Sequence, residues 1–340
     1  TEPRWRGLGM DEALTVRSAP SAISRAFQVT ADWASQPVDA YVRGKAVMQS
    51  EARIPFRGWR MTLFTTFDSI RERVNAFLKR PLAGEWPYLW LDATYLKQRE
   101  GGRIVSVAAI IAVAVDSEGR REIAGLHIGP SEAETFWATF LRSLHKRGLR
   151  GIKLVISDAH EGLKGAIRRV FGATWQRCRT HYAANLMGIT PKNMWPAVKA
   201  MLHSVYDQPD AASVHAQFDR LLDYVSEKLP TVAEHLDAAR ADILAFTTFP
   251  KDVWTQVWSN NPAERLNREI RRRTDAVGIF PNRAAIVRLV GAVLAEQTDE
   301  WAEGRRYLGL EVLARCRLTT VTNTGDEVDP DTELTLGLSA

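Results

Sequence analysis

The segment Tyr88-Leu-Trp-Leu-Asp92 is an apolar run that ends in an aspartate. A second segment, Leu154-Val-Ile-Ser-Asp158, has the same form. We predict strands over residues 88–94 and 153–157, each with a carboxylate at its end. In α/β sheets, binding and catalytic groups lie beyond the carboxyl ends of the strands. The sequence therefore predicts two acidic side chains at neighbouring positions of one buried sheet.

The chain around these two segments alternates between strand and helix patterns. Residues 103–115 are almost wholly apolar, as in a central strand that is covered on both faces. Ser131 and Glu134 have the spacing of a capping box at the start of a helix. The other expected elements are strands over 121–129 and 175–178, a helix that the capping box opens and that runs to about 146, and a helix over 160–171.

This order, β-β-β-α-β-α-β, predicts an α/β fold with a ribonuclease-H-like mixed sheet and flanking helices. Three antiparallel strands lead into a parallel pair, which brings the ends of the first and fourth strands together. An all-α pattern interrupts the fold, so we predict a helical insertion. The expected parts are an irregular N-terminal extension over 1–66, the first part of the sheet domain over 67–182, the insertion over 183–255, the last part of the sheet domain over 256–317 and a polar tail over 318–340.

The composition favours a polyanionic partner without requiring one. The chain has a net charge of +5 and a pI near 9.3. With two cysteines in 340 residues, a disulfide framework is not indicated, which suits a cytoplasmic protein. The longest apolar stretch, residues 104–115, is too short to span a bilayer. We found no nucleophile elbow, no Walker motif and no dinucleotide fingerprint.

A third acidic residue opens an arginine-rich segment, Glu264-Arg-Leu-Asn-Arg-Glu-Ile-Arg-Arg-Arg273. We predict a helix here that runs to about Thr274. Glu264, Asn267 and Arg271 would share one helix face. The candidate DNA-binding residues of this helix are Arg265, Asn267, Arg268, Arg271 and Arg272.

Each candidate also has a simpler interpretation. Asp92 can be a turn residue after a strand, Asp158 a helix cap, and Glu264 an ordinary acid in a first helical turn. Three converging carboxylates on a basic protein indicate instead a divalent-metal site that acts on phosphate. Cys178 and His181 are spaced C-x-x-H, but two ligands do not make a structural zinc site, so we favour a structural role for this pair.

Several segments together resemble the Mutator-type transposases of bacterial insertion sequences. They are Tyr88–Tyr95, Val155–Leu163, Gln176–His181, Asn261–Arg272 and Val277–Asn282. The resemblance implies a DDE transposase whose catalytic acids are Asp92, Asp158 and Glu264. It also places the family's C-x-x-H element on Cys178 and His181, and its basic residue after the glutamate on Arg271.

The resemblance further implies a mechanism and partners. Asp92 would bridge two Mg²⁺ ions, for which Mn²⁺ would substitute, while Asp158 and Glu264 would each hold one. A homodimer would cleave double-stranded DNA at the terminal inverted repeats and join the ends to target DNA. Residues 1–66 do not resemble the family's DNA-binding region, so a truncated or disrupted copy is expected. A nuclease on the same fold and an inactive DNA-binding remnant remain the alternatives.

Overall fold

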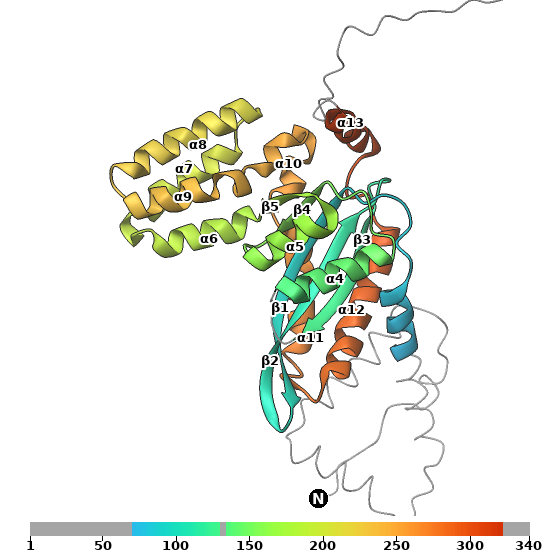
Figure 1. Ribbon diagram of the computed structural model, residues 1–340. Helices are drawn as coiled ribbons and strands as arrows, with labels where there is room; N and C mark the ends of the chain where they lie inside the picture. Colours follow the sequence, from blue (N-terminus) through green and yellow to red (C-terminus); the bar gives the residue numbers. More distant parts are fainter. Residues whose placement is uncertain (1–69, 130–133, 322–340) are drawn as a thin grey trace, which may run out of the picture.

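A computed structural model describes residues 70–129 and 134–321 of the chain. Its mixed sheet has the strand order β3-β2-β1-β4-β5 (Figure 1). The antiparallel part consists of β1 (Tyr88–Glu100), β2 (Arg103–Val115) and β3 (Arg121–Gly129), and the parallel part adds β4 (Leu154–Ser157) and β5 (Thr174–Arg177). The predicted ribonuclease-H-like sheet is confirmed.

The sequence pattern predicts Asp92 near the end of its strand. Asp92 is instead the fifth residue of a 13-residue strand. Beyond it, buried Leu96 and Gln98 alternate with exposed Tyr95 and Lys97. This alternation is typical of a strand with one buried face and one face in solvent. β1 pairs with β2 along its whole length. Ile156, the residue before the end of β4, pairs with Trp90, so the carboxyl end of β4 still lies close to Asp92.

Helices cover both faces of the sheet. On one face lie α4 (Glu134–Lys146) and α5 (Glu161–Phe171), which pack on Leu89, Leu91 and the even-numbered apolar positions of β2 (Figure 1). On the other face lie α11 (Asn261–Thr274) and α12 (Arg283–Glu303), which pack on Trp90 and Leu96. Because side chains alternate along β1, Asp92 points to the same face as Trp90, away from the two leucines.

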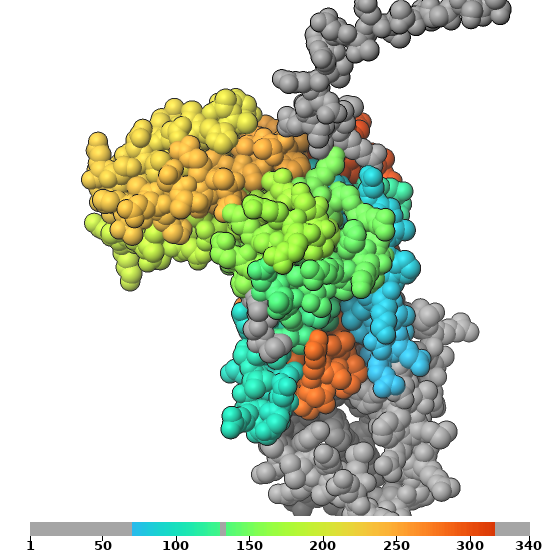
Figure 2. All heavy atoms as spheres, in the orientation of Figure 1, coloured from blue at the N-terminus to red at the C-terminus, as the bar shows by residue number. Residues whose placement is uncertain are grey.

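The helical region between β5 and α11 projects beyond one end of the sheet (Figures 1 and 2). It comprises α6 (Arg179–Ile189), α7 (Trp195–Tyr206), α8 (Ala211–Ser226), α9 (Pro230–Ile243) and α10 (Lys251–Val257), with 3-10 turns at Lys192–Met194 and Ala245–Thr248. Its core is continuous with that of the sheet, since Tyr206, Phe246 and Trp258 belong to the same cluster as Trp90. Gln176 of β5 joins the two parts: it donates to the Ile243 carbonyl at 3.0 Å and accepts from the Phe246 N–H at 2.7 Å.

The last part of the chain returns to the sheet. Ile279–Phe280 form a short strand, β6, which pairs in parallel with Lys97 and Gln98 of β1. The final helix, α13 (Leu310–Val321), runs past residue 318, where the polar tail was expected to begin. No helix in the described ranges has the length and apolarity that crossing a membrane requires.

Two other expectations fall on residues that the structure does not describe. The extension over 1–66 lies wholly outside the described ranges, as does Ser131 of the capping box. The first described element is a helix over residues 70–79.

Candidate functional site

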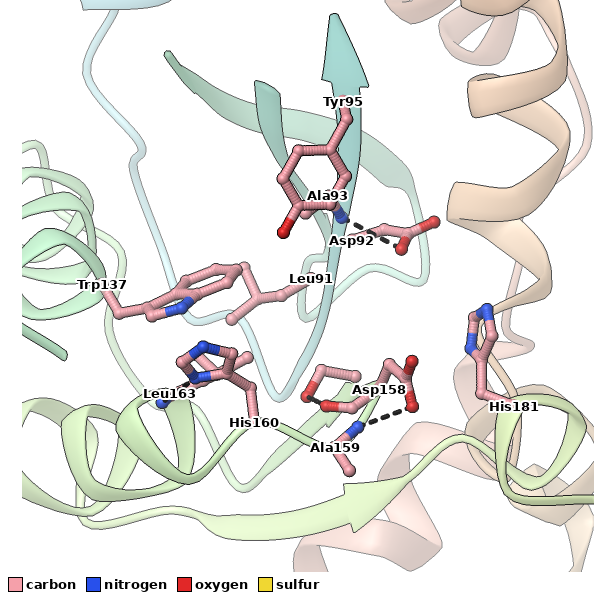
Figure 3. Close-up of a pocket in the computed structure, with 11 residues that line it drawn as sticks. Leu91, Asp92, Ala93, Tyr95, Trp137, Asp158, Ala159, His160, Leu163 and His181 are labelled. Atoms are coloured by element: carbon pink, nitrogen blue, oxygen red, sulfur yellow. Dashed lines mark hydrogen bonds between the residues drawn. The ribbon is translucent and has the colours of Figure 1, made fainter. Parts of the chain in front are cut away.

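Asp92 and Asp158 line one pocket of about 260 Å³ (Figure 3). Asp92 enters from the middle of β1, and Asp158 from the loop that follows β4. His181, in the first turn of α6, lies on the same pocket. The structure thus brings two of the three predicted acids together, and adds a histidine that the sequence analysis had assigned only a structural role.

Each of the two carboxylates is held by a hydrogen bond from the backbone N–H of the next residue. Asp92 accepts the Ala93 N–H at 3.0 Å, and Asp158 accepts the Ala159 N–H at 2.7 Å. Capping of α5 falls instead to His160, whose Nδ1 accepts the Leu163 N–H at 3.3 Å. Asp158 is therefore not the helix cap that its position in the sequence also allowed, and its carboxylate is directed to the pocket.

Partial burial raises the pKa of Asp92 from its ordinary 3.8 to about 6. The charge of nearby Glu264 adds to this increase, while His181 and two hydrogen bonds oppose it. The pKa of His181 is also raised, to about 9, by hydrogen bonding with Cys178 and by the charges of Asp158 and Asp92, while burial opposes this increase. An imidazolium beside the two acids partly compensates their charge in the absence of a metal.

Asn267 of α11 was predicted to bind DNA, but the structure places it elsewhere. Its side chain is only 7% exposed, and its Nδ2 donates a short hydrogen bond to Oδ2 of Asp92. Its Oδ1 is also buried, without a partner in the described part of the chain. Asn267 therefore positions a carboxylate and is too buried to contact DNA.

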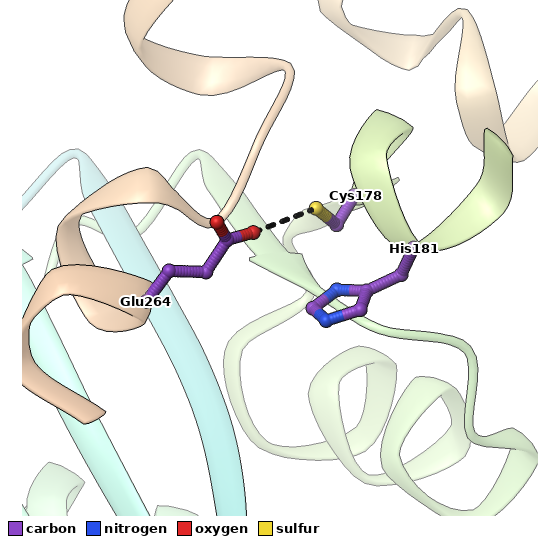
Figure 4. Close-up of side chains that lie close together, drawn as sticks. All are labelled: Cys178, His181 and Glu264. Carbon is purple, nitrogen blue, oxygen red and sulfur yellow. Dashed lines mark hydrogen bonds between the residues drawn. The ribbon is translucent and has the colours of Figure 1, made fainter. Parts of the chain in front are cut away.

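Glu264 does not line the pocket of the two aspartates. Its Oε1 lies 4.0 Å from the sulfur of Cys178, and His181 lies beside them (Figure 4). His181 therefore belongs to both groups, the aspartate pocket and this second cluster. Glu264 is close enough to affect the Asp92 carboxylate electrostatically, so the three acids occupy one region.

Two residues just before α11 fix this arrangement, and the sequence analysis did not single them out. The Ser259 carbonyl accepts from Trp90 Nε1 at 3.2 Å. Asn260 is fully buried: its side chain donates to the Leu91 carbonyl at 3.1 Å, and its N–H donates to the Cys178 sulfur at 3.2 Å. These bonds tie the start of α11 to β1 beside Asp92, so the position of Glu264 depends on tertiary contacts.

The arginines of α11 lie mostly on its exposed side. Four of them, Arg265, Arg268, Arg271 and Arg272, are exposed to solvent. Arg271 also reaches back to β1, where its Nε donates to Thr94 at 3.3 Å.

Arg272 is not a free cation, because Glu269 of the same helix accepts from it at 2.8 Å. Glu269 also pairs with Arg273, and Arg273 with Glu296 of α12, at 3.0 Å each. This network neutralises part of the charge at the end of α11. Among the described residues, no carboxylate forms an ion pair with Arg265, Arg268 or Arg271 of the same helix.

The residues present fit a hard divalent cation. Within residues 70–129 and 134–321, no lysine or arginine forms an ion pair with Asp92, Asp158 or Glu264. The raised pKa of Asp92 shows that its negative charge is poorly compensated. Carboxylate oxygens are the ligands that Mg²⁺ and Mn²⁺ prefer, and such ions would supply the missing positive charge.

Comparisons with known proteins agree with this architecture. The family described as "Transposase, Mutator family" matches residues 62–304. The chain is 60% identical over 270 residues to the transposase for insertion sequence element IS1081 of Mycobacterium tuberculosis, covering 79% of this chain and 65% of that protein. It is 35% identical over 249 residues to the transposase for IS256 in transposon Tn4001 of Staphylococcus aureus, covering 72% of this chain and 64% of that protein.

A third relative, the transposase for insertion sequence element IS406 of Burkholderia multivorans, is 40% identical over 239 residues, covering 70% of this chain and 61% of that protein. The chain thus spans less than two thirds of the length of each of these relatives. The family match covers most of the sheet, the helical region and α11, which together contain the pocket and Glu264. The chain therefore belongs to the Mutator family of transposases.

Proposed function

We propose that this protein is a DDE transposase that cleaves insertion-sequence DNA ends and joins them to target DNA. The observation that carries the proposal is the convergence of Asp92 and Asp158 on one pocket, with Glu264 on the adjoining helix, in a chain of this family. These three acids would hold two Mg²⁺ ions, and Mn²⁺ would replace them. When bound, such ions provide the Lewis acidity that activates water and stabilises a leaving 3′-oxygen.

The protein residues around the acids have supporting roles in this proposal. Asn267 donates to Oδ2 of Asp92 and the Ala93 N–H donates to Oδ1, so both oxygens are held in place, and each would bind a metal through a remaining lone pair. His181, whose pKa is raised, is positively charged beside the two aspartates. A bound metal ion would neutralise the aspartates in its place, and the aspartates would then no longer stabilise the charge on His181. The exposed Arg265 and Arg268 would bind the phosphate backbone of double-stranded DNA.

The proposal extends to the organisation of the chain. We assign residues 67–182 and 256–317 to the catalytic domain and residues 183–255 to an α-helical insertion, and propose that a dimer acts on paired inverted repeats. The buried contacts of Gln176 support a fixed position of the insertion relative to the sheet. A nuclease on the same fold would use the same acids but would not join DNA ends.

A joining assay tests the proposed function. Purified protein is mixed with pre-cleaved inverted-repeat ends, a target plasmid and MnCl₂ or MgCl₂, and joined products are counted. We expect joining by the wild type and none by Asp158→Asn. The matched control is Asp116→Asn, because Asp116 only closes the β2–β3 turn by accepting two N–H groups at 2.8 Å. Cleavage without joining would favour the nuclease, and DNA binding without either would favour an inactive remnant.

A further inference from the structure

Cys178, His181 and Glu264 form a compact group of possible metal ligands next to the aspartate pocket. One ligand atom from each residue lies within 4.8 Å of the other two. The three residues come from two places in the chain, since Cys178 and His181 lie at the start of α6 while Glu264 lies in the first turn of α11. The sequence spacing C-x-x-H supplies only two ligands, and the fold supplies the third (Figure 4).

The donors of this group suit a softer cation than those of the pocket. A thiolate, an imidazole and a carboxylate are typical ligands of Zn²⁺, whereas Mg²⁺ prefers oxygen alone. Tetrahedral zinc with bonds of about 2.0–2.3 Å places its ligand atoms about 3.3–3.8 Å apart. Here the sulfur and Oε1 of Glu264 are 4.0 Å apart, and all three ligand atoms lie within 4.8 Å of one another, so side-chain rotations that shorten these distances by up to about 1 Å complete the geometry. A water would occupy the fourth position, as in zinc sites with three protein ligands.

The surroundings of the sulfur favour this use. Cys178 is fully buried, and its sulfur accepts the N–H of Asn260 at 3.2 Å, an outer contact of the kind that orients metal-bound ligands. Asn260 is itself held by the Leu91 carbonyl, one residue from Asp92. The cluster is thus preformed by backbone and side-chain contacts rather than by long surface side chains.

We propose that Cys178, His181 and Glu264 bind Zn²⁺, and that this ion inhibits the enzyme by holding Glu264 away from the aspartate pocket. Glu264 would then have two alternative positions. With zinc bound, its carboxylate stays on Cys178 and His181, as it lies in this structure. For catalysis, it turns towards Asp92 to complete the set of acids. Binding of zinc displaces two protons to solvent, one from the thiol of Cys178 and one from the imidazolium of His181. The inhibitory part of this inference rests on the proposed function.

Cobalt absorption tests the metal site without requiring activity. CoCl₂ is titrated into the reduced full chain, because cobalt(II) bound by a thiolate gives an intense near-ultraviolet band. We expect a band that saturates at one equivalent and that ZnCl₂ abolishes. Cys178→Ser should remove the band, while Cys316→Ser, which changes the other buried thiol, should keep it. A band that persists in Cys178→Ser, or no band in the wild type, overturns the proposal.

Two further variants test the other ligands and guard against misfolding of Cys178→Ser. Glu264→Gln and His181→Gln both retain the thiol, so each should keep the band but weaken cobalt binding at least tenfold. Unchanged affinity in either variant shows that its side chain is not a ligand, which refutes the three-residue site. Circular dichroism of each variant confirms that it is folded.

Manganese binding tests the competition for Glu264. Free Mn²⁺ is followed by electron paramagnetic resonance with and without one equivalent of ZnCl₂. We expect zinc to weaken Mn²⁺ binding at least tenfold in the wild type and less than twofold in Cys178→Ser. Equal Mn²⁺ binding with and without zinc in the wild type overturns the inhibitory role. If Mn²⁺ does not bind even without zinc, the proposed function and the competition fail together, while the cobalt band still decides the zinc site.

Discussion

Replacement of Asp92 by asparagine should stabilise the metal-free protein at neutral pH while it removes a proposed catalytic acid. The pKa of Asp92 rises from its ordinary 3.8 in the unfolded chain to about 6 in the folded protein, mainly through burial. A group whose pKa is raised by folding gives its full stability below the unfolded pKa and loses it as pH rises through the folded pKa. The loss therefore develops between pH 3.8 and about 6 and is complete above that range.

The size of the effect follows from the same difference. At about 1.4 kcal/mol for each unit of pKa, the shift of Asp92 corresponds to about 3 kcal/mol of unfolding free energy. Partial exposure of Asp92 to solvent reduces this to roughly 2–3 kcal/mol. Asparagine removes the charge and retains an acceptor for the Ala93 N–H. Oδ2 of Asp92, which accepts from Nδ2 of Asn267, becomes an amide nitrogen in this variant. Rotation of the Asn267 amide by half a turn presents its Oδ1 to the new amide hydrogens, and this Oδ1 has no partner among residues 70–129 and 134–321.

Urea denaturation in EDTA, repeated from about pH 4 to pH 8, measures this prediction. Asp92→Asn should unfold with a free energy roughly 2–3 kcal/mol above that of the wild type at pH 8, and the difference should disappear near pH 4. Asp210→Asn is the control of opposite sign. Asp210 caps α8 by accepting from the Ser213 N–H at 2.8 Å, which lowers its pKa, so its replacement should destabilise at neutral pH. A destabilised Asp92→Asn at pH 8 would refute the reasoning.

Two further predictions concern the fold that positions the site. Gln176→Leu should destabilise the protein by about 2–4 kcal/mol, because it leaves the buried Phe246 N–H without its acceptor. Urea denaturation measures this loss, and a decrease in unfolding free energy below about 0.5 kcal/mol would contradict the prediction. Gly119→Ala should lower the melting temperature much more than Gly102→Ala. Both glycines have positive φ, but a Cβ at Gly119 would lie 1.9 Å from the Leu308 carbonyl oxygen, whereas Gly102 faces open space. Equal decreases in melting temperature would show that only φ matters.

The sheet could be predicted because the burial of a strand determines which of its positions are apolar. Residues 103–115 and 121–129 agree with β2 and β3 at both ends. In β2, residues 107–115 are buried and continuously apolar, as in a strand covered on both faces, while residues 103–106 are exposed or partly buried. The second half of β1 was missed, because alternation of buried and exposed residues beyond Asp92 was interpreted as the end of a strand. Gly101-Gly102, both with positive φ, is a two-residue hairpin turn and was the available signal.

The site was predictable only in part, for a physical reason. Asp92 and Asp158 follow apolar strand segments, so local patterns locate them. Glu264 is positioned by contacts between residues far apart in the chain, such as those of Asn260 with Leu91 and Cys178. Local spacing also put Asn267 on the face of Glu264 without showing that this face is buried against β1.

Crystals soaked in MnCl₂ and measured at the manganese absorption edge test the central claim most directly. The account predicts anomalous peaks in contact with Asp92 and Asp158, with Glu264 turned from Cys178 towards them, and no such peaks in crystals of Asp92→Asn. Ordered manganese at other sites, with the pocket of Asp92 and Asp158 empty, would contradict it.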